Sequence, residues 1–219
     1  MNLNRTRIKI CGLTQKHDID CAVALGVDAI GFVFYPPSKR YVAPEQASTL
    51  VRDLPAFVST VALFVNPSKQ DVQNVIEVLR PSLLQFHGDE TAEFCASFGL
   101  PYLKAFRVGA PMLDSPEGLA NFCAAFGNAA GWLFDSYTVA YGGSGQSFDY
   151  SLLSQVLEPQ FKARPVVVSG GLNHSNVSQA IQTLKPWAVD VSSGVEQAPG
   201  LKSAEKMADF VNAVRLIDK

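Results

Sequence analysis

A cysteine and an aspartate each stand where a short apolar run of this sequence ends. Cys11 closes RIKIC and precedes Gly12, and Asp135 closes GWLFD and precedes a polar, glycine-rich segment. A thiolate and a carboxyl group are both reactive groups, so each residue could take part in chemistry rather than in packing. The alternatives are an inert core thiol and a helix cap. The cap is disfavoured for Asp135, because the next helical segment starts only near residue 149.

The residues around Cys11 alternate in the manner of a strand. Side chains two apart share a face, so Lys9 and Cys11 point one way and Ile8 and Ile10 the other. If the isoleucines pack against helices, Lys9 lies inside the sheet about 7 Å from Cys11. A nearby cation lowers a cysteine pKa from its usual value of about 8.5, so we expect Lys9 to favour the thiolate. The remaining cysteines fall on helical segments and fit inert core thiols better: Cys21, Cys95 and Cys123.

Two segments near the end of the chain could bind an anion. VVVSGG places Gly170 and Gly171 after an apolar run, and VDVSSG places Ser192, Ser193 and Gly194 after the next one. Glycine allows backbone N–H groups to approach an anion closely, and a helix N-terminus adds a favourable dipole. Either segment alone could be an ordinary tight turn, but the occurrence of both in the last two units favours a phosphate site.

Other polar residues follow the apolar runs. Arg40, after two prolines in YPPSKR, could clamp a carboxylate through two hydrogen bonds or could be a solvated surface charge. His87, which ends LLQFH, could pair with Cys11 or simply hold a structural hydrogen bond. The glycines of YGGSG predict a flexible flap over a ligand, and no Lys-Ser/Thr pair follows to make them a P-loop. They are Gly142, Gly143 and Gly145.

The elements that must position these residues form a regular series. Eight short apolar runs recur, each followed by a segment with helical periodicity. The runs cover 7–11, 29–34, 59–65, 83–87, 102–106, 131–135, 165–169 and 188–192. Helix starts are indicated at Pro44, at Ser68 with Asp71 three residues on, and at Asn173.

This alternation predicts an α/β protein with an all-parallel sheet. We expect one domain over residues 1–219, a closed (β/α)8 barrel, because eight units are present. The alternative is a doubly wound open sheet, but no G-x-G-x-x-G follows the first run. In such a barrel the active site lies at the carboxyl ends of the strands, where Cys11, Arg40, His87, Asp135 and the two predicted anion-binding segments are placed.

Composition excludes several classes of function. With 219 residues and a net charge of −2, the chain has no basic surface expected of a nucleic-acid or anionic-membrane partner. No apolar run approaches the roughly 18 residues of a transmembrane helix, and no signal peptide precedes the first strand, so we expect a cytoplasmic location. The scattered cysteines and histidines predict reduced thiols and no metal site.

Together, several motifs resemble those of the phosphoribosylanthranilate isomerases of tryptophan biosynthesis. They run in order from about residue 7 to 215: KICGLT, GFVFYPPSKRYV, LQFHGDE, KAFRV, LFDS…GGSGQSFDY, SGGLNHSNV and VDVSSGVEQAPGLKSAEKM. The resemblance implies a (β/α)8 barrel that converts N-(5-phosphoribosyl)anthranilate to 1-(2-carboxyphenylamino)-1-deoxyribulose 5-phosphate by an Amadori rearrangement. It implies no cofactor and no metal, with a small phosphosugar-anthranilate as substrate and a monomer or homodimer as the assembly. Lys39 and Tyr150 depart from the family pattern, which often has proline and tryptophan there.

The same resemblance assigns roles. It makes Cys11 the general base and Asp135 the general acid, and it puts Arg40 at the anthranilate carboxylate. Further residues are matched by the motifs around them and are expected to bind substrate: His87, Arg107 and Asp190. The phosphate loops are expected to include Gly170, Gly171, Ser192, Ser193 and Gly194.

Four other readings are less consistent with the residues. The histidine-pathway aminoaldose isomerase is expected to use two carboxylates, which Cys11 contradicts. Indole-glycerol-phosphate synthase would require more lysine and glutamate at the mouth of the barrel. A non-catalytic phosphate-ligand sensor would leave the acid–base pair without a role, and a thiol-redox function would require a resolving cysteine near Cys11 in the sequence.

Overall fold

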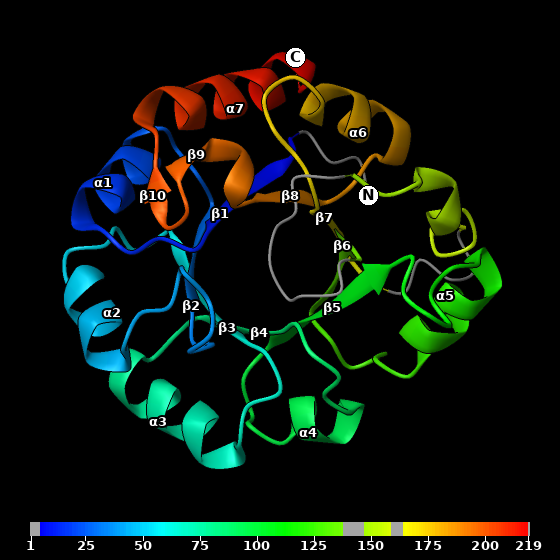
Figure 1. The fold of residues 1–219 in the computed structure, drawn as a ribbon, viewed down its shortest axis with the longest axis horizontal. Helices are drawn as coiled ribbons and strands as arrows, with labels where there is room; N and C mark the ends of the chain where they lie inside the picture. Colours follow the sequence, from blue (N-terminus) through cyan, green and yellow to red (C-terminus); the bar gives the residue numbers. More distant parts are fainter. Residues whose placement is uncertain (1–4, 138–146, 159–163, 219) are drawn as a thin grey trace.

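The structure, a computed structural model, describes residues 5–137, 147–158 and 164–218. Eight parallel strands close into a barrel in chain order, and the last pairs with the first (Figure 1). The strands are β1 (Arg7–Cys11), β2 (Ala29–Val33), β3 (Ser59–Phe64), β4 (Leu83–Phe86), β5 (Tyr102–Val108), β6 (Gly131–Ser136), β7 (Val166–Val168) and β8 (Ala188–Val191). The predicted barrel is therefore confirmed, with strand boundaries within two residues of the predicted runs.

Helices form a ring outside the strands, as Figure 1 shows. They are α1 (Lys16–Ala24), α2 (Pro44–Leu50), α3 (Lys69–Leu79), α4 (Ala92–Ala96), α5 (Pro116–Ala124), α6 (Val177–Leu184) and α7 (Ala204–Ile217), with 3-10 helices η1 (Tyr150–Leu153) and η2 (Ser193–Val195). Between β6 and β7, η1 is the one helical element of the described residues. None of the helices described is long and apolar enough to cross a membrane.

Local sequence signals explain where these helices begin. Ser68 and Asp71 form the predicted reciprocal cap of α3, and Pro44 occupies the first turn of α2. The predicted cap at Asn173 is wrong, because α6 starts later and its N-cap residue is Asn176. The Asn173 side chain instead accepts hydrogen bonds from the backbone N–H and the hydroxyl of Ser175, which makes a turn before the helix.

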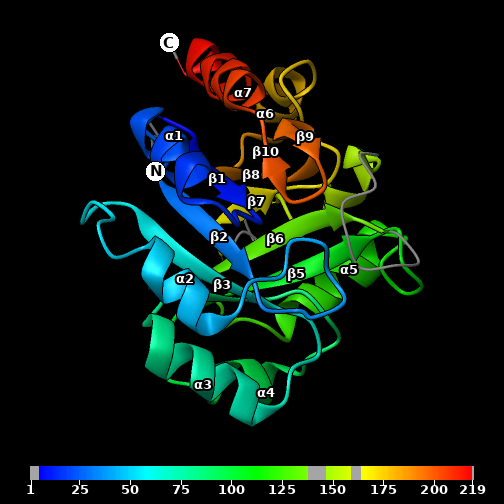
Figure 2. The ribbon, with the colours of Figure 1, turned by 60° about the vertical axis from the view of Figure 1, so that its left-hand side comes forward.

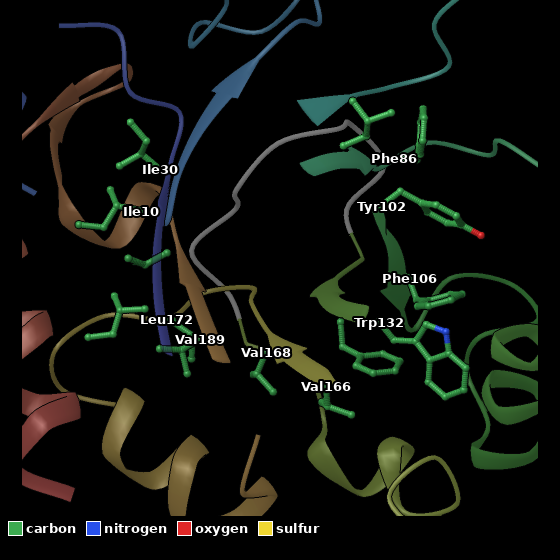
Figure 3. Close-up of a cluster of buried hydrophobic side chains, with 14 of the residues drawn as sticks. Ile10, Ile30, Phe86, Tyr102, Phe106, Trp132, Val166, Val168, Leu172 and Val189 are labelled. Atoms are coloured by element: carbon green, nitrogen blue, oxygen red, sulfur yellow. The ribbon is translucent and has the colours of Figure 1, made fainter. Parts of the chain in front are cut away.

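The main hydrophobic core lies between the barrel and the helices. Figure 3 shows its side chains pointing outward from the strands, among them Ile10, Ile30, Phe86 and Phe106. Ile8 and Ile10 are fully buried in this layer, as the alternation in β1 predicts. Burying such apolar side chains is the dominant favourable term in folding.

The barrel interior holds separate layers. At one level five residues form a small apolar cluster: Leu103, Ala105, Leu133, Val167 and Ala188. A second apolar cluster contains Cys11, Val33, Leu63 and Val65. Buried polar side chains share this interior, including Lys9, which forms an ion pair with Asp190 at 2.9 Å. Buried charges are tolerated when they are paired, which explains how Lys9 and Asp190 can lie deep in the barrel interior.

The two ends of the described chain meet where the barrel closes. The carboxylate of Asp218, just after α7, accepts hydrogen bonds from the backbone N–H of Thr6 at 2.9 and 3.0 Å and from its hydroxyl at 2.8 Å. Arg215 donates to the Thr6 carbonyl at 2.8 Å. As a result, the last helix, α7, packs beside the first helix, α1 (Figure 2).

Candidate active site

A cavity opens at the carboxyl ends of the strands, and it brings together most of the residues singled out from the sequence. Those lining it are Cys11, Arg40, His87, Asp135, Gly170, Gly171, Asp190, Ser192 and Ser193. Its wall also includes Tyr35, Ser38, Leu63, Val65, Gln85 and Leu172. Residues from seven of the eight strands, or from the loops after them, thus converge on one space.

Cys11 lies at the base of this cavity and is 4% exposed. Gly31, its register partner on β2, makes room for it, since a Cβ at Gly31 would lie 2.8 Å from the Cys11 sulfur. Burial raises the pKa of the Cys11 thiol, and the charge of Lys9 lowers it by less, so the net shift is upward. The predicted direction of the Lys9 effect is right, but the desolvation of the thiol outweighs it.

The Asp135 carboxylate has two polar neighbours. Its Oδ2 lies 3.0 Å from His87 Nε2, and its Oδ1 accepts a hydrogen bond from the backbone N–H of Ser136 at 2.9 Å. On the far side of the imidazole, Nδ1 lies 3.1 Å from the amide nitrogen of Gln85. His87 therefore contacts Asp135, and of the two roles predicted for it the hydrogen-bonding one fits this geometry.

Arg40 is held in place by a carboxylate of its own chain. Its Nε and Nη2 donate to the two oxygens of Glu196, each at 2.7 Å, and Lys202 donates to the same carboxylate at 2.8 Å. Burial raises the pKa of Glu196, but the interactions with Arg40 and Lys202 together lower it by more. The net pKa is therefore below the ordinary value. The other edge of the guanidinium is formed by Nη1 and Nη2. Among the described residues, the Glu196 bond to Nη2 is the one hydrogen bond to that edge.

The residues that hold Arg40 belong to a two-stranded hairpin after β8, made of β9 (Glu196–Ala198) and β10 (Leu201–Lys202). Lys202 also donates to the Ser192 carbonyl at 3.1 Å, and the Ser192 hydroxyl donates to the Cys11 carbonyl at 3.0 Å. These bonds connect the hairpin, the loop after β8 and the end of β1 into one network.

The predicted anion site is formed by the loops after β7 and β8. Gly170 and Gly171 have φ of 80° and 65°, a left-handed conformation that favours glycine. Among the described residues, none accepts a hydrogen bond from the backbone N–H of either glycine. Ser192 and Ser193 line the same end of the cavity, and η2 follows directly. Exposed backbone donors at this position suit a phosphate group.

Two predicted substrate-binding residues do not line the cavity. Arg107 forms an ion pair with Asp89 at 3.1 Å and lies over the Tyr137 ring, in a neighbouring depression. Gly194 packs against the Leu172 carbonyl, so closely that a Cβ there would overlap it. The predicted flap glycines, Gly142, Gly143 and Gly145, lie outside the described residues.

Sequence reasoning missed four residues of the site. Glu196 and Lys202 stand in a segment whose charges resemble a solvated surface, and only the fold turns them inward. Gln85 could have been found from its place two residues before His87, because that spacing puts Gln85 of β4 on the same side of the chain as His87, which directly follows the strand. Gly31 gave a weaker signal, a glycine within an apolar strand, which often marks a close approach of another group.

A metal site is not indicated by the described part of the chain, where no group of three His, Cys, Asp or Glu side chains is placed to hold an ion.

Comparison with known proteins decides the family. Residues 8–213 match the model of the family described as N-(5'-phosphoribosyl)anthranilate (PRA) isomerase. The chain belongs to this family. A relative from Bordetella petrii, named N-(5'-phosphoribosyl)anthranilate isomerase, is 59% identical over 214 residues, 98% of this chain and 97% of that protein.

Solved structures of family members have the same fold. The phosphoribosyl anthranilate isomerase of Thermus thermophilus superposes with a TM-score of 0.84 at 34% identity, over 97% of this chain and 100% of that one. Another phosphoribosyl anthranilate isomerase was solved in complex with reduced 1-(o-carboxyphenylamino)-1-deoxyribulose 5-phosphate. Its TM-score is 0.80 at 34% identity, over 96% of this chain and 98% of that one.

Proposed function

We propose that this cavity isomerises N-(5-phosphoribosyl)anthranilate with Cys11 as general base and Asp135 as general acid. The reaction is the aldose–ketose isomerisation of tryptophan biosynthesis, whose product is 1-(2-carboxyphenylamino)-1-deoxyribulose 5-phosphate. The observation that carries the assignment is that both groups line one cavity from strands that are not neighbours in the barrel, β1 and β6. The proposed scheme uses neither a cofactor nor a metal ion.

The first step is the opening of the furanose ring. Asp135 delivers a proton to the ring oxygen, the bond from that oxygen to C1′ breaks, and the nitrogen lone pair forms the C=N bond of a protonated Schiff base. The resulting carboxylate is stabilised by the N–H groups of His87 and Ser136 that face it.

The second step moves the double bond. The Cys11 thiolate removes the proton from C2′, and the electron pair of that C–H bond forms the enolamine while the C=N electrons return to nitrogen. In the ketonisation a proton is added to C1′ and the C2′ hydroxyl releases its own, which leaves the carbonyl at C2′ and returns one proton to Asp135 while Cys11 gives one up. Each of the two groups is expected to contribute about 10²–10⁴ in rate.

The two ends of the substrate supply binding energy that orients the reacting carbons. We place the phosphate at the N–H groups of Gly170 and Gly171 beside Ser192 and Ser193. The anthranilate carboxylate is assigned to the Nη1–Nη2 edge of Arg40, since Glu196 occupies the Nε–Nη2 edge. A guanidinium can bind two carboxylates in this way, one on each edge. Asp190 is expected to affect the reaction through its ion pair with Lys9. Arg107 and Gly194 do not line the cavity, so we expect them to affect substrate binding indirectly.

The test is the loss of fluorescence of phosphoribosylanthranilate generated in situ. We expect turnover by the wild-type protein and a fall of about 10²–10⁴ in kcat for Cys11→Ser and for Asp135→Asn. Cys21→Ser, at a half-buried position on α1, is the matched control and should retain full activity. Undiminished turnover in either variant would overturn its assigned role, and binding of the substrate without turnover by the wild-type protein would overturn the function.

We further propose that the protein is cytoplasmic and acts as a monomer or homodimer without a nucleic-acid partner. The net charge of −2 supports the last point. Light scattering on the purified protein tests the assembly, and a mass of three or more chains would contradict it.

A further inference from the structure

Gln85 is a fully buried amide on the interior face of β4, two residues before His87. Its neighbours Leu84 and Phe86 belong to the outer core, so Gln85 alone of these three points into the barrel. The Gln85 amide nitrogen lies 3.1 Å from His87 Nδ1, and His87 Nε2 lies 3.0 Å from Asp135 Oδ2. A continuous chain of polar groups thus runs from the barrel interior to the proposed acid.

The direction of the hydrogen bonds in this chain follows from what each group can do. An ionised carboxylate only accepts, so His87 Nε2 must carry a hydrogen when it faces the Asp135 carboxylate. In a neutral imidazole the other nitrogen, Nδ1, is then an acceptor. The Gln85 amide nitrogen is a donor and matches that need. The geometry is therefore consistent throughout with a neutral His87 whose hydrogen is on Nε2.

We propose that Gln85 is a positioning residue for the general acid, and that it acts by keeping the His87 hydrogen on Nε2. This inference rests on the proposed role of Asp135. When Asp135 carries its proton, a bare Nε2 at 3.0 Å would be the nearest base and would take it. With Nε2 already protonated, His87 can only donate, and the proton of Asp135 goes to the ring oxygen of the substrate. The same N–H then stabilises the carboxylate that remains.

The other end of the amide supports a role beyond stability. Gln85 Oε1 is buried and has no hydrogen-bond partner among the described residues. Leaving a buried carbonyl oxygen unpaired costs free energy, so an apolar side chain of the same shape would suit the interior better. Turning the amide over would pair Oε1 with Nδ1 only if that nitrogen carried a hydrogen. The orientation of the amide and the tautomer of His87 are thus coupled.

The experiment is ¹⁵N NMR of the imidazole nitrogens together with steady-state kinetics. The variant is Gln85→Met, which keeps the length of the side chain and removes the amide. The control is Leu103→Met. Leu103 is the register partner of Gln85 on β5, belongs to the small interior cluster that contains Leu133 and Val167, and does not line the cavity. The protein has three histidines, so comparison with His87→Gln assigns the His87 signals.

We expect the wild-type protein and Leu103→Met to show His87 protonated on Nε2 alone. Gln85→Met should show a mixture of tautomers and a kcat lowered about 10-fold, with KM changed less than about twofold. Gln85→Glu, whose carboxylate would bind an Nδ1–H, should shift His87 towards the doubly protonated form and also lower kcat.

Two results would overturn the inference. One is a wild-type His87 that carries its hydrogen on Nδ1, and the other is a Gln85→Met variant whose tautomer and kcat both match the wild type. Loss of activity together with a collapse of the amide NMR spectrum would identify Gln85 as merely structural, and would overturn it as well. The NMR result does not depend on turnover, so failure of the proposed function would be recognised separately.

Discussion

Cys11 starts from the protonation state opposite to the one that the reaction needs. Burial raises the pKa of the Cys11 thiol, which keeps its proton at neutral pH. The proposed base is the thiolate. Substrate binding therefore has to select the less populated protonation state of Cys11, as a ligand selects a minor conformation.

The rate of Cys11 alkylation measures the protonation state of its thiol. Because the folded pKa is raised, the thiolate fraction and hence the alkylation rate should increase from neutral to alkaline pH, with a midpoint above that of an ordinary cysteine. In Lys9→Met/Asp190→Asn, which removes a buried ion pair together, the midpoint should move higher still, since the lowering effect of Lys9 is the larger of the two. The measurement uses a Cys21→Ser background and mass spectrometry of the labelled peptide.

The control for that labelling is Cys11→Ser in the same background, which should take up no label near neutral pH. Cys95 is deeply buried, and burial raises its pKa to about 12, so it should not interfere. A Cys11 midpoint at or below that of an ordinary thiol would contradict the account.

Single residues of the site could be predicted where position alone carries the information. Cys11, Asp135, Gly170 and Gly171 all follow apolar runs, and strand ends converge in a parallel barrel. The raised pKa of Cys11 could not be predicted, because it depends on burial by strands that are distant in the sequence. The same reason hides Glu196, whose partner Arg40 is 156 residues away.

At the scale of elements, the turn after β1 and the β9–β10 hairpin together fix Arg40. Gly12 has φ of 73°, and a Cβ on it would lie 2.5 Å from Arg40 Cδ and 3.1 Å from Ser192 Oγ. The Arg40 side chain therefore crosses directly over the glycine that follows Cys11. Glu196, from the hairpin, then sets the direction of the guanidinium.

Gly12→Ala should displace Arg40 and weaken substrate binding. We expect KM to rise about tenfold, which corresponds to about 1.4 kcal/mol of lost binding, with a smaller effect on kcat. The matched control is Gly26→Ala: Gly26 has a similar φ of 74°, but a Cβ there would meet no atom within 4 Å. Both variants have a similar positive φ, so the difference in KM between them separates the contacts with Arg40 and Ser192 from backbone strain. Equal KM values in the two variants would contradict this explanation.

The order and type of the elements could be predicted because each βα unit carries its own periodicity and caps. Ser68 with Asp71 is an example, since both partners lie within four residues. The β9–β10 hairpin could not be predicted in the same way. Its strands have three and two residues, and what holds it against the barrel is the bonding of Lys202 to Glu196 and to the loop after β8.

At the scale of the whole molecule, closure depends on the two ends of the described chain. Parallel strands require long connections, and the pairing of β1 with β8 joins the two barrel strands that are most distant in the sequence. The bonds from Thr6 to Asp218, and from Arg215 to Thr6, secure that seam from outside the barrel. Thr6 lies just before the amino end of β1, whereas the cavity opens at the carboxyl ends of the strands. These bonds should therefore affect stability and leave catalysis unchanged.

Asp218→Ala should lower the free energy of unfolding by about 1–3 kcal/mol, because it removes the acceptor of the part-buried Thr6 N–H. The change is measured by urea unfolding followed through tryptophan fluorescence, and kcat should equal that of the wild type. Asp209→Ala, an exposed position on the same helix, is the control and should change stability by less than about 0.5 kcal/mol.

The same unfolding curves test our proposal that residues 1–219 form one domain. One domain predicts a single cooperative transition in the wild type and in both variants. Two separate transitions in the wild-type protein would contradict that proposal, and an unchanged stability of Asp218→Ala would contradict the role of the seam.

The division of labour between Cys11 and Asp135 is tested most directly by a kinetic isotope effect with substrate deuterated at C2′ of the ribose. Removal of that hydrogen is assigned to Cys11, so weakening the base in Cys11→Ser should make the step rate-limiting and raise the isotope effect on kcat well above the wild-type value. In Asp135→Asn the slow step is ring opening, which precedes the cleavage of the C2′–H bond, and the isotope effect should fall towards one. An isotope effect that increases in Asp135→Asn and not in Cys11→Ser would contradict the assignment of acid and base.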